Sequence, residues 1–111
     1  MNLLYKATRD GFSHLNFKEK CLGKSNTLVV VLTEFNKIVG GFTPLQWKRP
    51  VNGSHEYAKD ESKNTFLFSL NLEKKYKLNK PGYAICNSKE LGPIFGGGEF
   101  YFYLFLFIFN F

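Results

Sequence analysis

The sequence predicts a mainly β fold of the α+β type, in which two antiparallel sheets pack face to face as a β-sandwich and one short helix lies near the N-terminus. Two observations predict it. Runs of strand length, rich in β-branched and aromatic residues, recur at short spacing between turn residues. One segment alone carries a helix start signal. Many short strands beside few helices are typical of sheets packed on one another.

The first predicted elements are an extended segment and the helix. Residues 3–7 suit a short strand, and Asp10 and Gly11 mark a turn after it, because glycine accepts the positive φ that such turns need. Ser13 offers a hydroxyl that caps a helix running to about Cys21.

Residues 27–33 are the strongest predicted strand. Their unbroken aliphatic run favours a central strand that is buried on both faces. Asn36 tolerates a left-handed turn, so we expect the chain to return as a hairpin through residues 38–42. The paired Gly40 and Gly41 predict that a neighbouring group packs closely on this second strand.

Residues 43–64 are polar and contain proline, glycine and scattered charges, with neither a helical nor a strand period. The pattern predicts a long loop, and loops of this length are often binding segments. We expect Trp47 to anchor it to the core.

The next segments predict three strands. Residues 65–70 alternate, which places Phe66, Phe68 and Leu70 on one strongly apolar face. Residues 76–78 and 83–86 are two further short strands joined through a turn that contains proline and glycine.

The tail is the most hydrophobic part of the chain. Every residue from 100 to 109 is aromatic or aliphatic, and no charge follows Glu99. A helix of residues 100–111 reaches only about 18 Å, short of the ~30 Å hydrocarbon core, so we expect no transmembrane segment. We expect residues 99–111 to form a strand whose two faces both need cover, because exposed aromatic faces lead to aggregation.

Four blocks of residues stand in a characteristic order and spacing. They are residues 3–12, which end in Arg9, Asp10, Gly11 and Phe12; residues 40–43, which begin with Gly40 and Gly41; residues 65–70, which contain Phe66 and Phe68; and residues 92–98, which end in Gly96, Gly97 and Gly98. Together they closely resemble the TLDc domain of eukaryotic proteins linked to oxidation resistance.

This resemblance implies a β-sandwich with a few peripheral helices. It also implies a non-catalytic interaction domain, associated in some members with the vacuolar proton-pumping ATPase and in others with protection against oxidative damage. It implies no agreed active site and no cofactor. The resemblance runs from about residue 3 to residue 98, so we read residues 1–98 as a TLDc-like domain whose C-terminal part is incomplete. Residues 99–111 are then a tail read from AT-rich sequence, or alternatively a genuine hydrophobic strand.

The formal net charge of +6 excludes little by itself. Lysines and arginines are spread along the chain, and no motif that reads nucleic acid accompanies them, so we expect a protein partner and no nucleic acid. A loose basic cluster contains Lys74, Lys75, Lys77 and Lys80. Charged residues interrupt the N-terminus at Lys6, Arg9 and Asp10, which predicts no secretory signal and a cytoplasmic protein.

The candidate chemical groups are few. The triple glycine lacks the lysine and hydroxyl residues of a phosphate loop, so it predicts a tight turn. Cys21 and Cys86, with His14 and His55, show no metal-ligand spacing and no disulfide framework. Two alternatives to an interaction domain stay open: a thiol-based redox or peroxide-consuming enzyme that uses either cysteine, and a non-functional fragment of a longer TLDc protein.

Overall fold

The computed structural model describes residues 1–33, 36–51, 53–77, 81–89, 91–95, 100–101 and 107–111. Over these residues it contains two short α-helices, α1 (Ala7–Asp10) and α2 (His14–Cys21), and one 3-10 turn, η1 (Pro81–Tyr83). The remaining elements are strands, and the mainly β prediction is confirmed.

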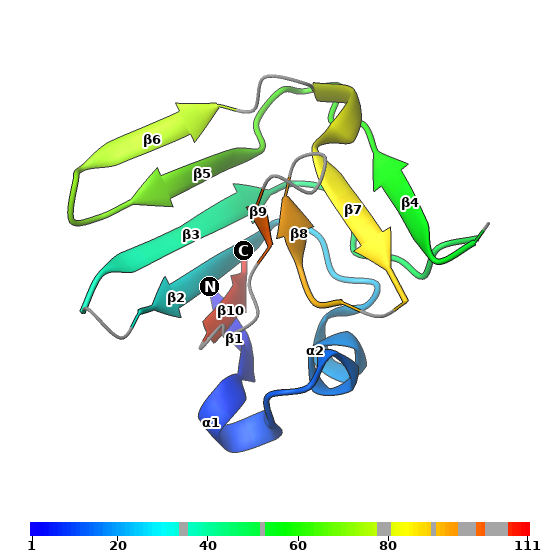
Figure 1. Ribbon diagram of the computed structural model, residues 1–111, viewed down its shortest axis with the longest axis horizontal. Coiled ribbons are helices and arrows are strands. Elements are labelled where there is room, and N and C mark those ends of the chain that lie inside the picture. The colour runs from blue at the N-terminus through cyan, green and yellow to red at the C-terminus, as the bar shows by residue number, and fades with distance from the viewer. Residues whose placement is uncertain (34–35, 52, 78–80, 90, 96–99, 102–106) are drawn as a thin grey trace.

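The described strands form two antiparallel sheets (Figure 1). The larger sheet contains, in spatial order, β1 (Asn2–Lys6), β10 (Phe107–Asn110), β2 (Thr27–Leu32), β3 (Ile38–Thr43), β5 (Phe66–Ser69) and β6 (Lys74–Lys77). The smaller sheet contains β4 (His55–Ala58), β7 (Ile85–Ser88), β8 (Ile94–Phe95) and β9 (Phe100–Tyr101).

The helix predicted after Ser13 is present as α2. The Ser13 hydroxyl accepts a hydrogen bond from the Asn16 backbone N–H at 3.3 Å, and the Ser13 N–H donates to the Asn16 side-chain oxygen at 3.1 Å. This reciprocal pair is a capping box. Gly11 has the predicted positive φ, at 108°. The single turn α1 precedes it, so the expectation of one helix is corrected to two.

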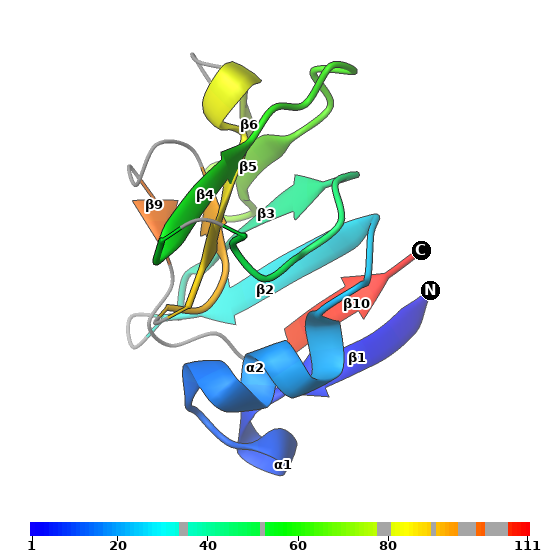
Figure 2. The same ribbon diagram turned by 90° about the vertical axis from the view of Figure 1, so that its right-hand side faces the viewer.

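β2 lies inside the larger sheet, between β10 and β3, as predicted for a central strand. It pairs with β3 as the expected hairpin, and Asn36 has a left-handed φ of 58°. The expected burial of both faces is wrong. Val29 and Val31 are buried, whereas Val30 is half-buried and Leu32 is exposed. The reason is that α2 and the smaller sheet cover one face of the larger sheet (Figure 2).

The segment 43–64 is anchored by Trp47, as expected. Its indole is 2% exposed and donates from Nε1 to the Thr27 hydroxyl at 2.8 Å. The prediction of a long unstructured loop is wrong, however, because the segment includes β4, which pairs with β7. β4 is an edge strand with mostly exposed side chains, so it carries no apolar period that the sequence alone would reveal.

Three of the later strands, β5, β6 and β7, were predicted, whereas β8 (Ile94–Phe95) was not. β5 and β6 form a hairpin, and β7 begins at Ile85, two residues after the predicted start. The tail, predicted as one strand, is divided: β9 pairs with β8 in the smaller sheet, and β10 lies between β1 and β2 in the larger sheet. Residues 102–106 and the triple glycine lie outside the described residues.

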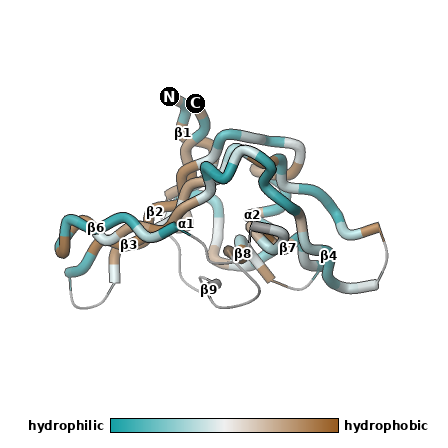
Figure 3. Tube along the Cα trace, turned by 90° about the horizontal axis from the view of Figure 1, so that it is seen from above, coloured by the Kyte–Doolittle hydropathy of each residue, from teal (hydrophilic) through white to brown (hydrophobic). Residues whose placement is uncertain are grey.

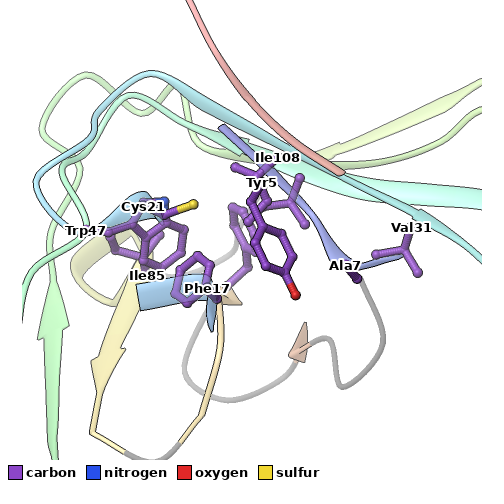
Figure 4. Packing of buried hydrophobic residues seen from close by; sticks show 10 residues of the cluster. Tyr5, Ala7, Phe17, Cys21, Val31, Trp47, Ile85 and Ile108 are labelled. Carbon is purple, nitrogen blue, oxygen red and sulfur yellow. The ribbon is translucent and has the colours of Figure 1, made fainter. Parts of the chain in front are cut away.

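The core lies between the larger sheet, the smaller sheet and α2 (Figure 4). Its buried members are Tyr5, Ala7, Phe17, Cys21, Val29, Val31, Trp47, Ile85, Phe95 and Ile108. The Trp47 ring makes edge contacts with Phe17 and Phe95, at centroid distances of 5.7 and 5.9 Å. These contacts join α2, the 43–54 segment and β8. No helix in the described part of the chain is long and apolar enough to span a membrane.

Candidate interaction surface

The outer side of the larger sheet, which faces away from α2 and the smaller sheet, presents two rows of side chains that cross the strands. Residues paired on neighbouring antiparallel strands share a face. The first row is Lys6, Phe107, Val30, Gly40, Phe68 and Lys75, and the second is Leu3, Phe109, Leu28, Phe42, Phe66 and Lys77. We call these two rows the aromatic face.

Alternation along the strands separates this face from the core. Val29 and Ile108 point inward and are fully buried, while their neighbours Val30 and Phe107 are only half-buried. Seen from above, β8 and β9 lie on one side of β2, β3 and β6 (Figure 3). The aromatic face is the opposite side of these strands.

The phenylalanines of the aromatic face pack on one another. Phe66 lies beside Phe42 and Phe68, with ring centroids 5.6 and 6.5 Å away. Phe107 and Phe109 are stacked at 6.1 Å. All five rings are half-buried, so they form a continuous apolar surface rather than isolated exposed side chains.

The paired glycines let aromatic rings approach β3 closely on both of its sides. A Cβ on Gly40 would lie 2.6 Å from the Phe68 ring on the aromatic face, and a Cβ on Gly41 would lie 2.8 Å from the Phe95 ring on the core side. The predicted close approach is confirmed, and it occurs on both sides at once. Only glycine lets Phe68 lie flat over β3 while Phe95 packs beneath it.

Lysines stand at both ends of the rows. The Lys6 ammonium lies 5.8 Å from the Phe107 ring centroid, and the Lys75 ammonium lies 4.2 Å from that of Phe66. Both contacts are of the cation–π type. Neither row contains a carboxylate, and the ion pairs recorded among the described residues, which include Arg9–Asp10, involve none of these lysines. The aromatic face is therefore apolar in its centre and positive at its two edges.

The block around Arg9 forms a turn rather than an open site. The Arg9 guanidinium donates to the Asp10 carboxylate at 2.8 and 3.0 Å, and the Lys6 backbone N–H donates to the same carboxylate at 3.0 Å. The Arg9 hydrogen bond, followed by that of Lys6, lowers the pKa of Asp10 to about 2. The buried Tyr5 hydroxyl donates to the Gly11 carbonyl. These bonds fix the chain between β1 and α2.

The predicted site residues do not converge on one place. Gly40, Phe66 and Phe68 meet on the aromatic face, Gly41 and Trp47 face the core, and Phe12 is exposed beside the turn between the helices. Gly96, Gly97 and Gly98 lie outside the described residues. The sequence did not assign Phe42, Phe107 or Phe109 to the surface: alternation shows which residues share a face, but not which face points outward.

The two cysteines do not form a reactive site. Both are free and buried. Burial raises the pKa of the Cys21 thiol to about 12, with the nearby Asp10 charge adding to the effect, and burial also raises the pKa of Cys86. Among the described side chains no group of three or more histidine, cysteine or acidic residues is placed to hold a metal ion. The described residues therefore present no thiolate and no metal centre.

A shallow pocket lies between α2 and β7. Its lining includes Lys18, Glu19, Arg49 and Lys89. The Lys18 ammonium already donates to the Lys89 carbonyl, and Glu19 offsets part of the positive charge. The pocket therefore lacks the unshared cluster of cations that an anion site needs.

The sequence profile of the TLDc domain matches residues 1–107 of the chain. The chain belongs to the TLDc domain family. The match continues past Gly98, where we expected the resemblance to end, and reaches the first residue of β10. TLDc is a domain of the protein-interaction type, and its match spans the aromatic face except for Phe109. A comparison with curated proteins finds no match.

Proposed function

We propose that this TLDc domain is a non-catalytic protein-interaction domain and that its aromatic face is the surface a protein partner contacts. The observation that carries the proposal is the continuous set of half-buried phenylalanines between lysine edges. Monomeric proteins rarely leave an apolar surface of this kind open, and aromatic residues are enriched at interfaces.

We further propose that the partner is a subunit of the vacuolar proton-pumping ATPase, reached from the cytoplasm, and that protection against oxidative damage is the physiological result. Membership of the TLDc family supports this choice of partner. The positive edges of the aromatic face are compatible with an acidic contact on that subunit.

The alternative of a thiol-based redox or peroxide-consuming enzyme receives no support from the described residues. Such chemistry requires a partly exposed cysteine with a lowered pKa. Cys21 and Cys86 are 0% and 3% exposed, and the pKa of each is raised.

The proposed function is tested by capturing purified pump subunits on the full 111-residue chain. Phe66→Ser is compared with wild type, and Phe12→Ser serves as the matched control because Phe12 is exposed and lies outside the two rows. We expect Phe66→Ser to lose at least nine tenths of the captured subunit and Phe12→Ser to retain it. Equal capture by all three proteins contradicts the role of the aromatic face, and no capture by wild type contradicts the pump as partner. Thermal unfolding of each variant confirms that it is folded.

A further inference from the structure

We infer that the aromatic face binds an acidic amphipathic helix of a protein partner, lying across the strands from β1 to β6. The inference rests on the proposed function and assigns the chemistry of the partner. It follows from the dimensions of the two rows, from their charge and from the symmetry that a second copy of the chain would impose.

The dimensions match one helix. Neighbouring strands lie about 4.8 Å apart, so a row that crosses from β1 to β6 is about 24 Å long. The two rows are two residues apart, or about 7 Å, along every strand except β1, where a bulge makes the separation three residues. A helix rises about 1.5 Å per residue and is about 10 Å across, so about 16 residues of helix cover both rows. Helices commonly form the second layer over an open sheet face.

The charges select an acidic helix. Lys6 stands at one end of the rows, and Lys75 and Lys77 stand at the other, with only apolar side chains and Gly40 between them. The formal net charge of the chain is also +6. A helix with an apolar stripe in its middle and carboxylates near both ends complements this arrangement, and each exposed ion pair adds modestly to affinity.

A second copy of the chain fits less well. In any two-fold face-to-face pairing, each end of the rows meets either the same end or the opposite end of the other copy. Both edges of the face carry lysine, Lys6 on β1 and Lys75 with Lys77 on β6, so lysine-bearing edges meet in both arrangements. A membrane also fits less well, because the five rings lie half-buried against one another and do not project, whereas peripheral binding buries apolar side chains about 5–10 Å deep.

The test uses three labelled 18-residue peptides and the full chain, with binding measured by fluorescence anisotropy. The first peptide has leucines at helical i, i+3, i+4 and i+7 positions and glutamates near both ends. The second keeps the leucine stripe and carries lysines instead of glutamates. The third is a scrambled acidic peptide without a stripe. We expect the first to bind at least tenfold more tightly than either of the others, and the difference from the second to shrink at high salt.

The matching variants are Lys75→Glu with Lys77→Glu, and the control is Lys48→Glu with Lys89→Glu, since these exposed lysines lie beside β7 and outside the aromatic face. The first pair of substitutions should weaken binding of the acidic stripe peptide about tenfold, and the control pair should not.

Equal binding of the acidic and basic stripe peptides overturns the acidic helix but leaves an interaction face in place. Binding only to phosphatidylserine vesicles overturns it in favour of a membrane. Self-association that Phe66→Ser abolishes overturns it in favour of a second copy. Failure of the proposed function has a separate readout in the capture experiment: Phe66→Ser and wild type would then capture equal amounts of the pump subunit.

Discussion

Gly40 and Phe68 face each other on β3 and β5, and a Cβ added to Gly40 would lie 2.6 Å from the Phe68 ring and would also meet the Val29 carbonyl oxygen. The glycine thus determines how flat the aromatic face is in its centre. A side chain at this position must displace both the Phe68 ring and the backbone of the neighbouring strand β2.

We therefore predict that Gly40→Ala destabilises the domain by about 1–3 kcal/mol, the usual cost of overpacking. Chemical denaturation of both proteins measures the difference. Gly82→Ala is the control, because a Cβ on Gly82 meets nothing within 4 Å and should change stability by less than about 0.5 kcal/mol. A neutral Gly40→Ala would contradict this account, because it would require both Phe68 and the β2 backbone to give way without cost.

A second prediction concerns the bond between Trp47 and Thr27. Both residues are buried, so Trp47→Phe removes the donor and leaves the Thr27 hydroxyl without it. We expect a loss of about 1–3 kcal/mol. Adding Thr27→Val to the Phe variant should cost much less than Thr27→Val alone, because the partner is already gone. Strictly additive losses in this double-mutant cycle would mean that the two side chains do not interact.

The third prediction is a pH dependence at the turn between the helices. The pKa of Asp10 is lowered from 3.8 to about 2, first by the Arg9 hydrogen bond and then by the Lys6 N–H. A lowered pKa stabilises the fold above pH 3.8, and this contribution is lost as the pH falls from about 4 to about 2. Asp10→Asn should therefore have a lower Tm than wild type at pH 5, and the Tm values of the two proteins should converge near pH 2. A Tm difference that stays the same from pH 5 to pH 2 would contradict this prediction.

The fourth prediction concerns thiol reactivity. Because Cys21 and Cys86 are buried and the pKa of each is raised, iodoacetamide at pH 7.5 should modify neither within an hour in the native protein and both in denaturant. Mass spectrometry of the intact chain counts the adducts. Rapid labelling of either cysteine in the native protein would contradict this prediction and would support the alternative of a thiol-based enzyme.

The sequence predicts elements whose signals are local. The aliphatic run of β2, the left-handed Asn36 and the Ser13 cap each lie within a few residues of the structure that they specify. β4 was missed because an exposed edge strand exists through its partner β7, which lies far along the chain. The division of the tail between two sheets is a similar choice between distant partners.

The candidate surface shows the same limit. Alternation places Phe66 and Phe68 on one side of β5 and Leu67 on the other, but it does not say which side faces the core. Pairing with β3 decides this, because it sets Leu67 beside Gly41 on the core side, which Phe95 fills. The more apolar side of β5 therefore points outward, and no local pattern reveals it.

The most direct test of the aromatic face is amide chemical-shift mapping of the full chain by NMR as the acidic stripe peptide is added. The account predicts that the largest shifts fall in β10, β2, β3 and β5, the strands that carry the phenylalanine rows. It also predicts small shifts in β4, β7 and α2, which lie on the other side of the larger sheet. Shifts concentrated in β4, β7 or α2 would contradict it.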